Sequence, residues 1–153
     1  MREILFRGKW IGNGEWVEGY YCKISETTYA FAEDYERNPI PVHHYILHET
    51  MTDWGLPNRF NQYEIDPETL CQCTGKTDED GKKIFEGDIV GFDDIYSTES
   101  GYSESSCLGE VVWSAEECCF HVTNRLSAES WEVLDECKVV GNVFDNPELI
   151  EEQ

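Results

Sequence analysis

The sequence has few basic residues for its length. It holds 11 Lys and Arg against 32 Asp and Glu in 153 residues, which gives a formal net charge of −21. Between Lys83 and Arg125 there is no further Lys or Arg. A surface this acidic repels nucleic-acid phosphates and anionic membranes, so direct binding to either is not expected. A solvated acidic face is the simplest interpretation, and a cationic partner or imitation of a polyanion are the functional ones.

The sequence also lacks a long apolar run. Its first residues, Met-Arg-Glu-Ile-Leu-Phe-Arg-Gly, do not resemble a signal peptide, and no later stretch is apolar enough to span a bilayer. We therefore expect a cytoplasmic protein with reduced thiols. The seven cysteines are odd in number and irregularly spaced. Cys22, Cys71, Cys107 and Cys137 are interpreted as small hydrophobic residues.

Complete catalytic motifs are missing. Gly75-Lys76-Thr77 resembles the end of a phosphate-binding loop, but Leu70 stands where that loop needs a glycine. Asp78-Glu79-Asp80-Gly81 fails as a calcium loop, because the EF-hand spacing would place its two anchor ligands at Lys76 and Gly87. A Gly-x-Ser-x-Gly nucleophile motif is absent. These absences lean against an enzyme.

Soft metal ligands are present without the spacing of a zinc site. The candidates are Cys71-x-Cys73, the adjacent Cys118-Cys119, and His43-His44 with His48. Structural zinc sites usually combine two pairs of ligands, each with two intervening residues. No matched second pair occurs, so we expect neither a metal nor another cofactor.

Short β-strands dominate the expected secondary structure. Asn13-Gly14 predicts a type I′ turn in an N-terminal hairpin, with Trp16, Tyr20, Cys22 and Ile24 on one strand face. Further strands are expected at 29–31, 42–47, 89–92, 110–113, 118–122 and 138–144. Pro39 and Pro41 fit either an edge strand or an extended connection before residue 42. We expect loops at 51–61 and 93–106, and residues 127–137 fit either a helix or a strand.

Two short helices and a tight turn complete the prediction. Asp66-Pro67 and Asn146-Pro147 each offer an N-cap followed by proline at the first helical position. Asp78 to Gly81 reads as a turn that ends on glycine. We expect one unit over 1–153: a hairpin region with an irregular insertion over 1–64, and a core over 65–153.

Three blocks of sequence resemble the YopX family of bacteriophage and prophage proteins: 6–20, 65–90 and 139–149. The resemblance implies a mainly β fold (β-rich α+β), with the N-terminal hairpin region packed on a small C-terminal SH3-like barrel. It also implies self-association in a bacterial host cell, and it supplies no catalytic residues. Segments 25–63 and 93–108 look individual to this chain. The shared residues form a structural signature: Gly8, Trp16, Gly19, Asp66, Pro67, Thr74, Gly75, Gly81, Glu86, Gly87, Asp88, Gly141, Asn142, Asn146 and Pro147.

Three functional hypotheses follow. The leading one is a non-catalytic accessory protein that binds a host or phage protein or forms a homo-oligomer. The second is a mimic of DNA that inhibits a nucleic-acid-binding host protein through Asp93, Asp94, Glu116 and Glu117. The third is a metal-dependent hydrolase in which Asp78, Glu86 and Asp88 converge.

Overall fold

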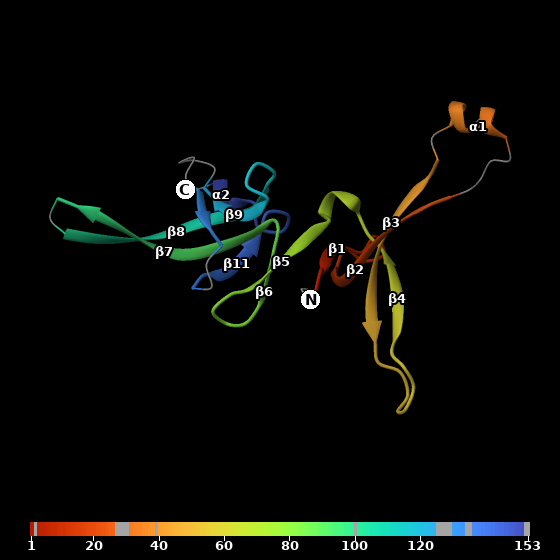
Figure 1. Cartoon of the computed structure of the whole chain (residues 1–153), viewed down its shortest axis with the longest axis horizontal. Coiled ribbons are helices and arrows are strands. Elements are labelled where there is room, and N and C mark those ends of the chain that lie inside the picture. Colours follow the sequence, from red (N-terminus) through yellow and green to blue (C-terminus); the bar gives the residue numbers. More distant parts are fainter. Residues whose placement is uncertain are drawn as a thin grey trace. The chain divides into compact units, whose positions relative to one another are not determined.

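The structure is a computed structural model that describes residues 1, 3–26, 31–38, 40–99, 101–124, 130–133 and 136–151, with the side chains at 35, 94–98, 104 and 130 outside the description. The predicted mainly β fold is confirmed, because antiparallel strands make up most of it. The chain divides into two compact units (Figure 1). We call Ile4–Leu70 the N-terminal unit, and Cys71–Gln153 with Met1–Glu3 the C-terminal unit.

The N-terminal unit is built on a sheet with the strand order β4-β3-β2-β1. Its elements are β1 (Phe6–Lys9), β2 (Trp16–Ser25), α1 (Ala32–Arg37), β3 (Val42–Thr50), β4 (Arg59–Glu64) and the 3-10 helix η1 (Pro67–Thr69). Strands β3 and β4 project as a long hairpin at one end of this sheet, and α1 lies at the opposite end (Figure 1).

Several expectations for this unit were wrong. Strand β3 pairs with β2 on one side and β4 on the other, so it is not an edge strand; Pro41 precedes it and removes no ladder donor. The expected loop over 51–61 ends earlier, because β4 begins at Arg59. Phe31 directly precedes α1 rather than lying in a strand, and residues 29–30 lie outside the described part.

The first hairpin exists, but its turn is not type I′. That turn needs a positive φ at both central residues, and at this turn Gly14 alone has one, at 75°. The turn is a longer loop instead, in which the amides of Asn13 and Gly14 both donate to the Trp10 carbonyl, at 3.4 and 2.8 Å. The Asn13 side chain accepts from the Glu15 amide at 2.9 Å, so it stabilises the loop locally.

The C-terminal unit combines the hairpin β5 (Cys71–Thr77)–β6 (Lys83–Phe85) with a five-stranded sheet of order β10-β9-β8-β7-β11. The sheet strands are β7 (Asp88–Thr98), β8 (Gly101–Ser114), β9 (Cys119–Thr123), β10 (Ser130–Glu132) and β11 (Lys138–Asn142), and helix α2 (Glu148–Glu151) follows. The expected loop over 93–106 is wrong, because β7 and β8 pair continuously from Ile89–Glu110 to Thr98–Gly101. Serine and acidic residues misled the prediction there, since an exposed ladder tolerates polar side chains.

A hydrophobic core lies within the C-terminal unit. Its members come from β6, β7, β8, β9, β11 and the chain around β10: Ile84, Val90, Phe92, Val111, Val122, Val133, Cys137 and Val139. Alternation at period 2 places these side chains on one face of each strand. The SH3-like barrel expected for this region stays a prediction. The ambiguous segment 127–137 contains strand β10, while residues 125–129 and 134–135 lie outside the described part.

Candidate functional site

In the block of residues 65–90, several polar side chains form hydrogen bonds with the main chain. At the start of η1, the Asp66 carboxylate accepts from the Glu68 amide at 3.0 Å. Thr69 donates to the Asp66 carbonyl at 2.7 Å and accepts from the Lys9 amide at 2.8 Å. In the C-terminal unit, Thr74 donates to the Ile84 carbonyl at 3.0 Å. Each bond satisfies a main-chain group that the adjoining strand or helix leaves open.

Asp78 is the most heavily used of these residues. One carboxylate oxygen accepts from the amides of Lys82 and Asp80, at 2.8 and 3.0 Å, and the other accepts from Val139 at 3.1 Å. Burial raises the pKa of Asp78, but the three amide hydrogen bonds outweigh it and leave the pKa below its ordinary value. The carboxylate thus ties the β5–β6 turn to β11.

The proposed hydrolase triad is not assembled as a ligand group. Buried Asp88 uses a carboxylate oxygen to accept from the Phe85 amide at 2.8 Å, and Asp78 is committed to its three amides. Neither Asp78, Glu86 nor Asp88 belongs to a group of three metal-capable side chains among the described residues. The carboxylates of Asp78 and Asp88 act as acceptors that stabilise turns.

Other signature residues show close packing. Gly87 has a φ of 77°, and a Cβ placed there would lie 3.2 Å from the Phe144 ring. A Cβ at Gly141 would lie 2.6 Å from Oδ1 of Asn146, so any larger residue would displace the Asn146 side chain. Asn142 accepts from the amides of Phe144 and Asp145, at 3.0 Å each. These positions require small or cap-forming residues for structural reasons.

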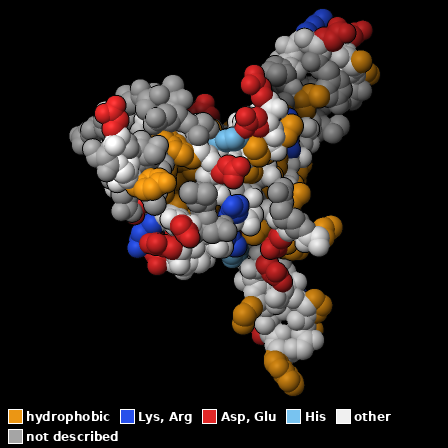
Figure 2. Space-filling view, turned by 60° about the vertical axis from the view of Figure 1, so that its left-hand side comes forward, with side chains coloured by type: hydrophobic (Ala, Val, Ile, Leu, Met, Phe, Trp, Pro, Cys, Tyr) orange, Lys and Arg blue, Asp and Glu red, His pale blue; other side chains and the backbone are white. Residues whose placement is uncertain are grey.

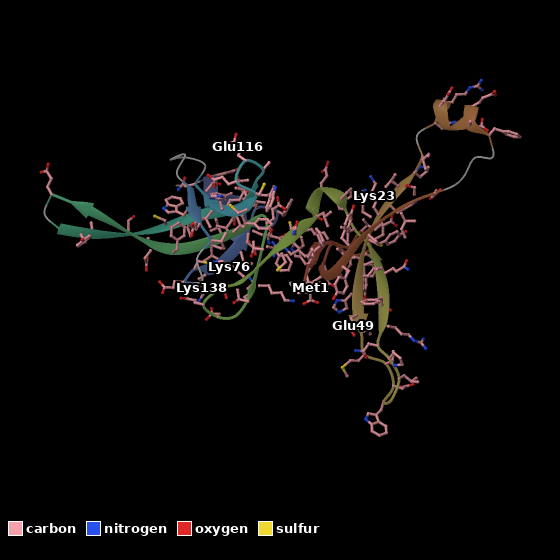
Figure 3. The ribbon with its side chains drawn as sticks, viewed as in Figure 1. Met1, Lys23, Glu49, Lys76, Glu116 and Lys138 are labelled. Atoms are coloured by element: carbon pink, nitrogen blue, oxygen red, sulfur yellow. The ribbon has the colours of Figure 1, made fainter. Side chains whose placement is uncertain are left out.

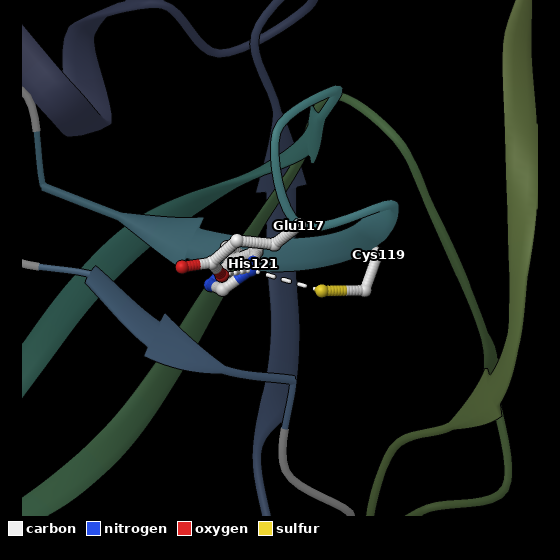
Figure 4. A group of neighbouring side chains, drawn as sticks. All are labelled: Glu117, Cys119 and His121. Carbon is white, nitrogen blue, oxygen red and sulfur yellow. Dashed lines mark hydrogen bonds and ion pairs between the residues drawn. The ribbon is translucent and has the colours of Figure 1, made fainter.

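A group of potential metal ligands lies at the β8–β9 turn (Figure 4). Glu117 comes from the turn, and Cys119 and His121 follow on β9. Nε2 of His121 is 2.5 Å from a Glu117 carboxylate oxygen and 3.1 Å from Sγ of Cys119. All three ligand atoms lie within 4.8 Å of one another. Among the described residues, no other group of three His, Cys, Asp or Glu side chains is this close.

This group borders a pocket of about 380 Å³ in the C-terminal unit. Its wall also includes Thr74 and Lys76 from β5, Trp113 and Phe120, and Glu132 with Val133 from the neighbourhood of β10. The Lys76 ammonium donates to the Val133 carbonyl at 2.6 Å, which fixes the cation at the wall. A pocket with apolar rings and a few converging polar groups is typical of ligand sites.

The sequence contained a signal for this group that pair spacing missed. Cys118-Cys119 was considered as a metal-ligand pair, but the two differ in the structure: the Cys118 thiol faces the Ala115 carbonyl at 3.6 Å, and Cys119 faces His121. Residues i and i+2 of a strand share a face, so Cys119-x-His121 was the informative spacing. Cys71 and Cys73 are both buried.

The three histidines of β3 each have another partner. His43 lies between two carboxylates, with Nδ1 2.6 Å from Glu64 and Nε2 2.6 Å from Glu26. Nδ1 of His44 lies 2.8 Å from the Tyr21 hydroxyl, and Nδ1 of His48 lies 2.7 Å from the Glu18 carbonyl. The candidate ligand set His43-His44-His48 is therefore not brought together among the described residues.

The β3–β4 arm, which we define as residues 49–60, carries exposed hydrophobic side chains. Trp54 is fully exposed, and Met51, Leu56 and Phe60 are exposed around it. Glu49 marks the end of β3 where the arm begins (Figure 3). In the space-filling view the arm is the lowest projection and ends in hydrophobic side chains (Figure 2). Exposed apolar groups gathered at one tip typify an interaction surface.

Of the acids proposed to imitate a polyanion, the three whose side chains the structure describes do not lie together. Asp93 on β7 pairs with Ser106, whereas Glu116 and Glu117 lie in the turn beyond Ser114, about 25 Å further along β8 at the usual strand rise. Glu116 projects from that turn (Figure 3). The Asp94 side chain lies outside the described part.

Comparison with known proteins decides the family. The model of the family described as YopX protein matches residues 5–151. The chain belongs to the YopX family. No curated protein matches this YopX chain. A solved structure, that of protein EF1440 from Enterococcus faecalis, is similar to it with a TM-score of 0.51 and 19% identity, over 98% of this chain and 99% of the other. At that identity the likeness extends to the fold alone.

The YopX chain shows no membrane-spanning helix among its described residues. Its helices α1 and α2 span six and four residues.

Proposed function

We propose that this YopX protein is a non-catalytic accessory protein of a phage or prophage, working in the bacterial cytoplasm, and that it self-associates through the β3–β4 arm. The carrying observation is the exposed tip formed by Met51, Trp54 and Leu56. Burying such a side chain in a protein contact contributes about 1.5–3 kcal/mol relative to water. An accessory role follows from the family resemblance.

The charge distribution favours a second copy of the chain as the occupant of this surface. Two copies that each carry −21 repel one another over most of their surface. Residues 51–60, the outer part of the arm, contain one acid, Asp53, and one base, Arg59, and therefore have no net charge. Glu49 at the base of the arm adds one negative charge. Like-charged copies can meet at residues 51–60 with little repulsion, and the tip supplies apolar area.

Sedimentation over a range of protein and salt concentrations tests this proposal. We expect a concentration-dependent oligomer that salt strengthens, because salt screens the repulsion between acidic copies. Trp54→Ala should weaken self-association at least about tenfold, as expected when a central aromatic anchor is removed.

Tyr102→Ala is the matched control, because Tyr102 is also an exposed aromatic residue but lies on the β7–β8 hairpin. It should associate like the wild type. A wild-type protein that stays monomeric at every concentration, or a Trp54→Ala variant that associates normally, would contradict the proposal. Weakening of association by salt would indicate that charged groups, and not the apolar tip, hold the copies together.

A further inference from the structure

We propose that Glu117, Cys119 and His121 form a binding site for a zinc ion at the β8–β9 turn. The three side chains offer a carboxylate, a thiolate and an imidazole nitrogen, which are the ligand types that zinc takes in proteins. Nε2 of His121 is the meeting point, at 2.5 Å from the Glu117 carboxylate and 3.1 Å from the Cys119 sulfur.

Hydrogen bonding alone accounts poorly for this arrangement. Nε2 carries at most one hydrogen, which can point at the carboxylate or at the sulfur but not fully at both. A cation placed between the three atoms accepts an electron pair from each of them. In a tetrahedral zinc site, bonds of about 2.0–2.3 Å place neighbouring ligand atoms about 3.3–3.8 Å apart. The separations of 2.5 and 3.1 Å are shorter than that spacing, and the exposed side chains of Glu117 and Cys119 can turn outward to reach it.

The local backbone explains why these residues converge. Cys119 and His121 occupy alternate positions of β9 and therefore share a face. Cys118 before them has a φ of 54°, a left-handed conformation that a non-glycine residue seldom adopts. This kink ends the turn and lets Glu117 approach the same face as Cys119 (Figure 4).

The ligand count predicts a water molecule as the fourth ligand. Structural zinc sites are closed by four protein ligands, whereas sites with three keep a position for water or another molecule. Here that position borders the 380 Å³ pocket whose wall includes Lys76 and Glu132. Glu132 pairs with His121 across β9 and β10, so both side chains project from the same sheet face. On binding, the Cys119 thiol releases its proton to solvent, because the thiolate is the ligand.

Cobalt titration of the full chain, after chelation and in the presence of a reductant, tests the site. Co²⁺ replaces Zn²⁺ in such sites and gives a thiolate charge-transfer band together with the visible bands of tetrahedral cobalt. We expect one Co²⁺ per chain, displacement by one Zn²⁺, and no displacement by Mg²⁺, which prefers oxygen ligands. Affinity should rise with pH as the thiol deprotonates.

The neighbouring cysteines provide the decisive pair of variants. Cys119→Ser should remove the charge-transfer band, whereas Cys118→Ser should retain it, since that thiol faces the Ala115 carbonyl. Glu117→Gln should weaken Zn²⁺ binding at least about tenfold. Absence of the band in the wild type, or its persistence in Cys119→Ser, would overturn the proposal. Because Cys119 is exposed, the Cys119→Ser variant should have the circular dichroism spectrum and the melting curve of the wild type. That match would exclude misfolding as the cause of a lost band.

Discussion

Of the sixteen buried hydrophobic residues among those described, thirteen lie in the C-terminal unit, and the N-terminal unit contributes Leu5, Ile46 and Ile65. The order reverses for large hydrophobic side chains that are exposed. Eleven of sixteen lie in the N-terminal unit, including Trp54 and Met51 on the β3–β4 arm. Both units contain hydrophobic side chains, but the C-terminal unit contributes most of the buried ones and the N-terminal unit contributes most of the large exposed ones.

The two units differ in the interactions that stabilise them. The C-terminal unit removes apolar area from water in its own core, which is the dominant stabilising effect in folding. The N-terminal unit depends more on the pairing of its strands, seen in the continuous registers of β2 with β3 and β3 with β4. Its apolar side chains are exposed, so we assign stability mainly to the C-terminal unit and propose the N-terminal unit for contact with another protein chain.

Removing a core ring from the C-terminal unit should have the largest effect. Phe92 is 7% exposed and meets Trp131 edge-on, with ring centroids 5.1 Å apart. Phe92→Ala should lower the free energy of unfolding by about 3–5 kcal/mol, because it removes transfer energy and leaves a cavity. Phe60→Ala on the exposed arm should change it by less than about 0.5 kcal/mol. Urea denaturation measures both, and similar costs for the two would refute the contrast.

The buried carboxylate of Asp78 should have a smaller effect that depends on pH. Asp78→Asn replaces one of the two accepting oxygens by an NH₂ group, which then faces a main-chain N–H, a donor against a donor. The substitution should lower the free energy of unfolding by about 1–3 kcal/mol at neutral pH. Asp80→Asn is the control, since that side chain is exposed and pairs with Lys138.

The pH dependence has a definite sign. The pKa of Asp78 is lower in the folded state than its ordinary 3.8, so the folded protein holds the ionised form more tightly. Its stabilisation is present above about pH 4 and is lost as pH falls through the folded pKa. The difference in unfolding free energy between wild type and Asp78→Asn should therefore shrink in acid. A constant difference from neutral pH to strong acid would contradict this role.

Local sequence grammar predicted some elements well. A cap followed by proline placed η1 and α2, and alternation of apolar residues located β2, β8 and β11, because these signals depend on neighbours in the chain. The strands with polar faces were missed: β4 contains Arg59, Asn61 and Gln62, and most of the β7–β8 hairpin reads as a loop. Their order comes from pairing with a distant strand, which side-chain polarity does not encode.

The candidate site illustrates the same limit. Zinc spacing rules look for two ligand pairs, whereas this group combines one strand pair, Cys119 and His121, with an acid from the preceding turn. The turn geometry that brings Glu117 close depends on the left-handed backbone of Cys118. No composition or period predicts that conformation at a cysteine.

His43 offers the smallest and most local test of the contrast, inside the N-terminal sheet. Hydrogen bonds with Glu64 and then Glu26 raise the pKa of His43 above 6.5, against a weaker opposing effect of desolvation. A raised folded pKa means that this pairing stabilises the protein below about pH 6.5 and is lost as pH rises through the folded pKa. In an NMR titration His43 should titrate above 6.5, and Glu64→Gln should lower that value. If Glu64→Gln left the midpoint of the His43 titration unchanged, the contact between His43 and Glu64 would not contribute to the pairing of β3 with β4.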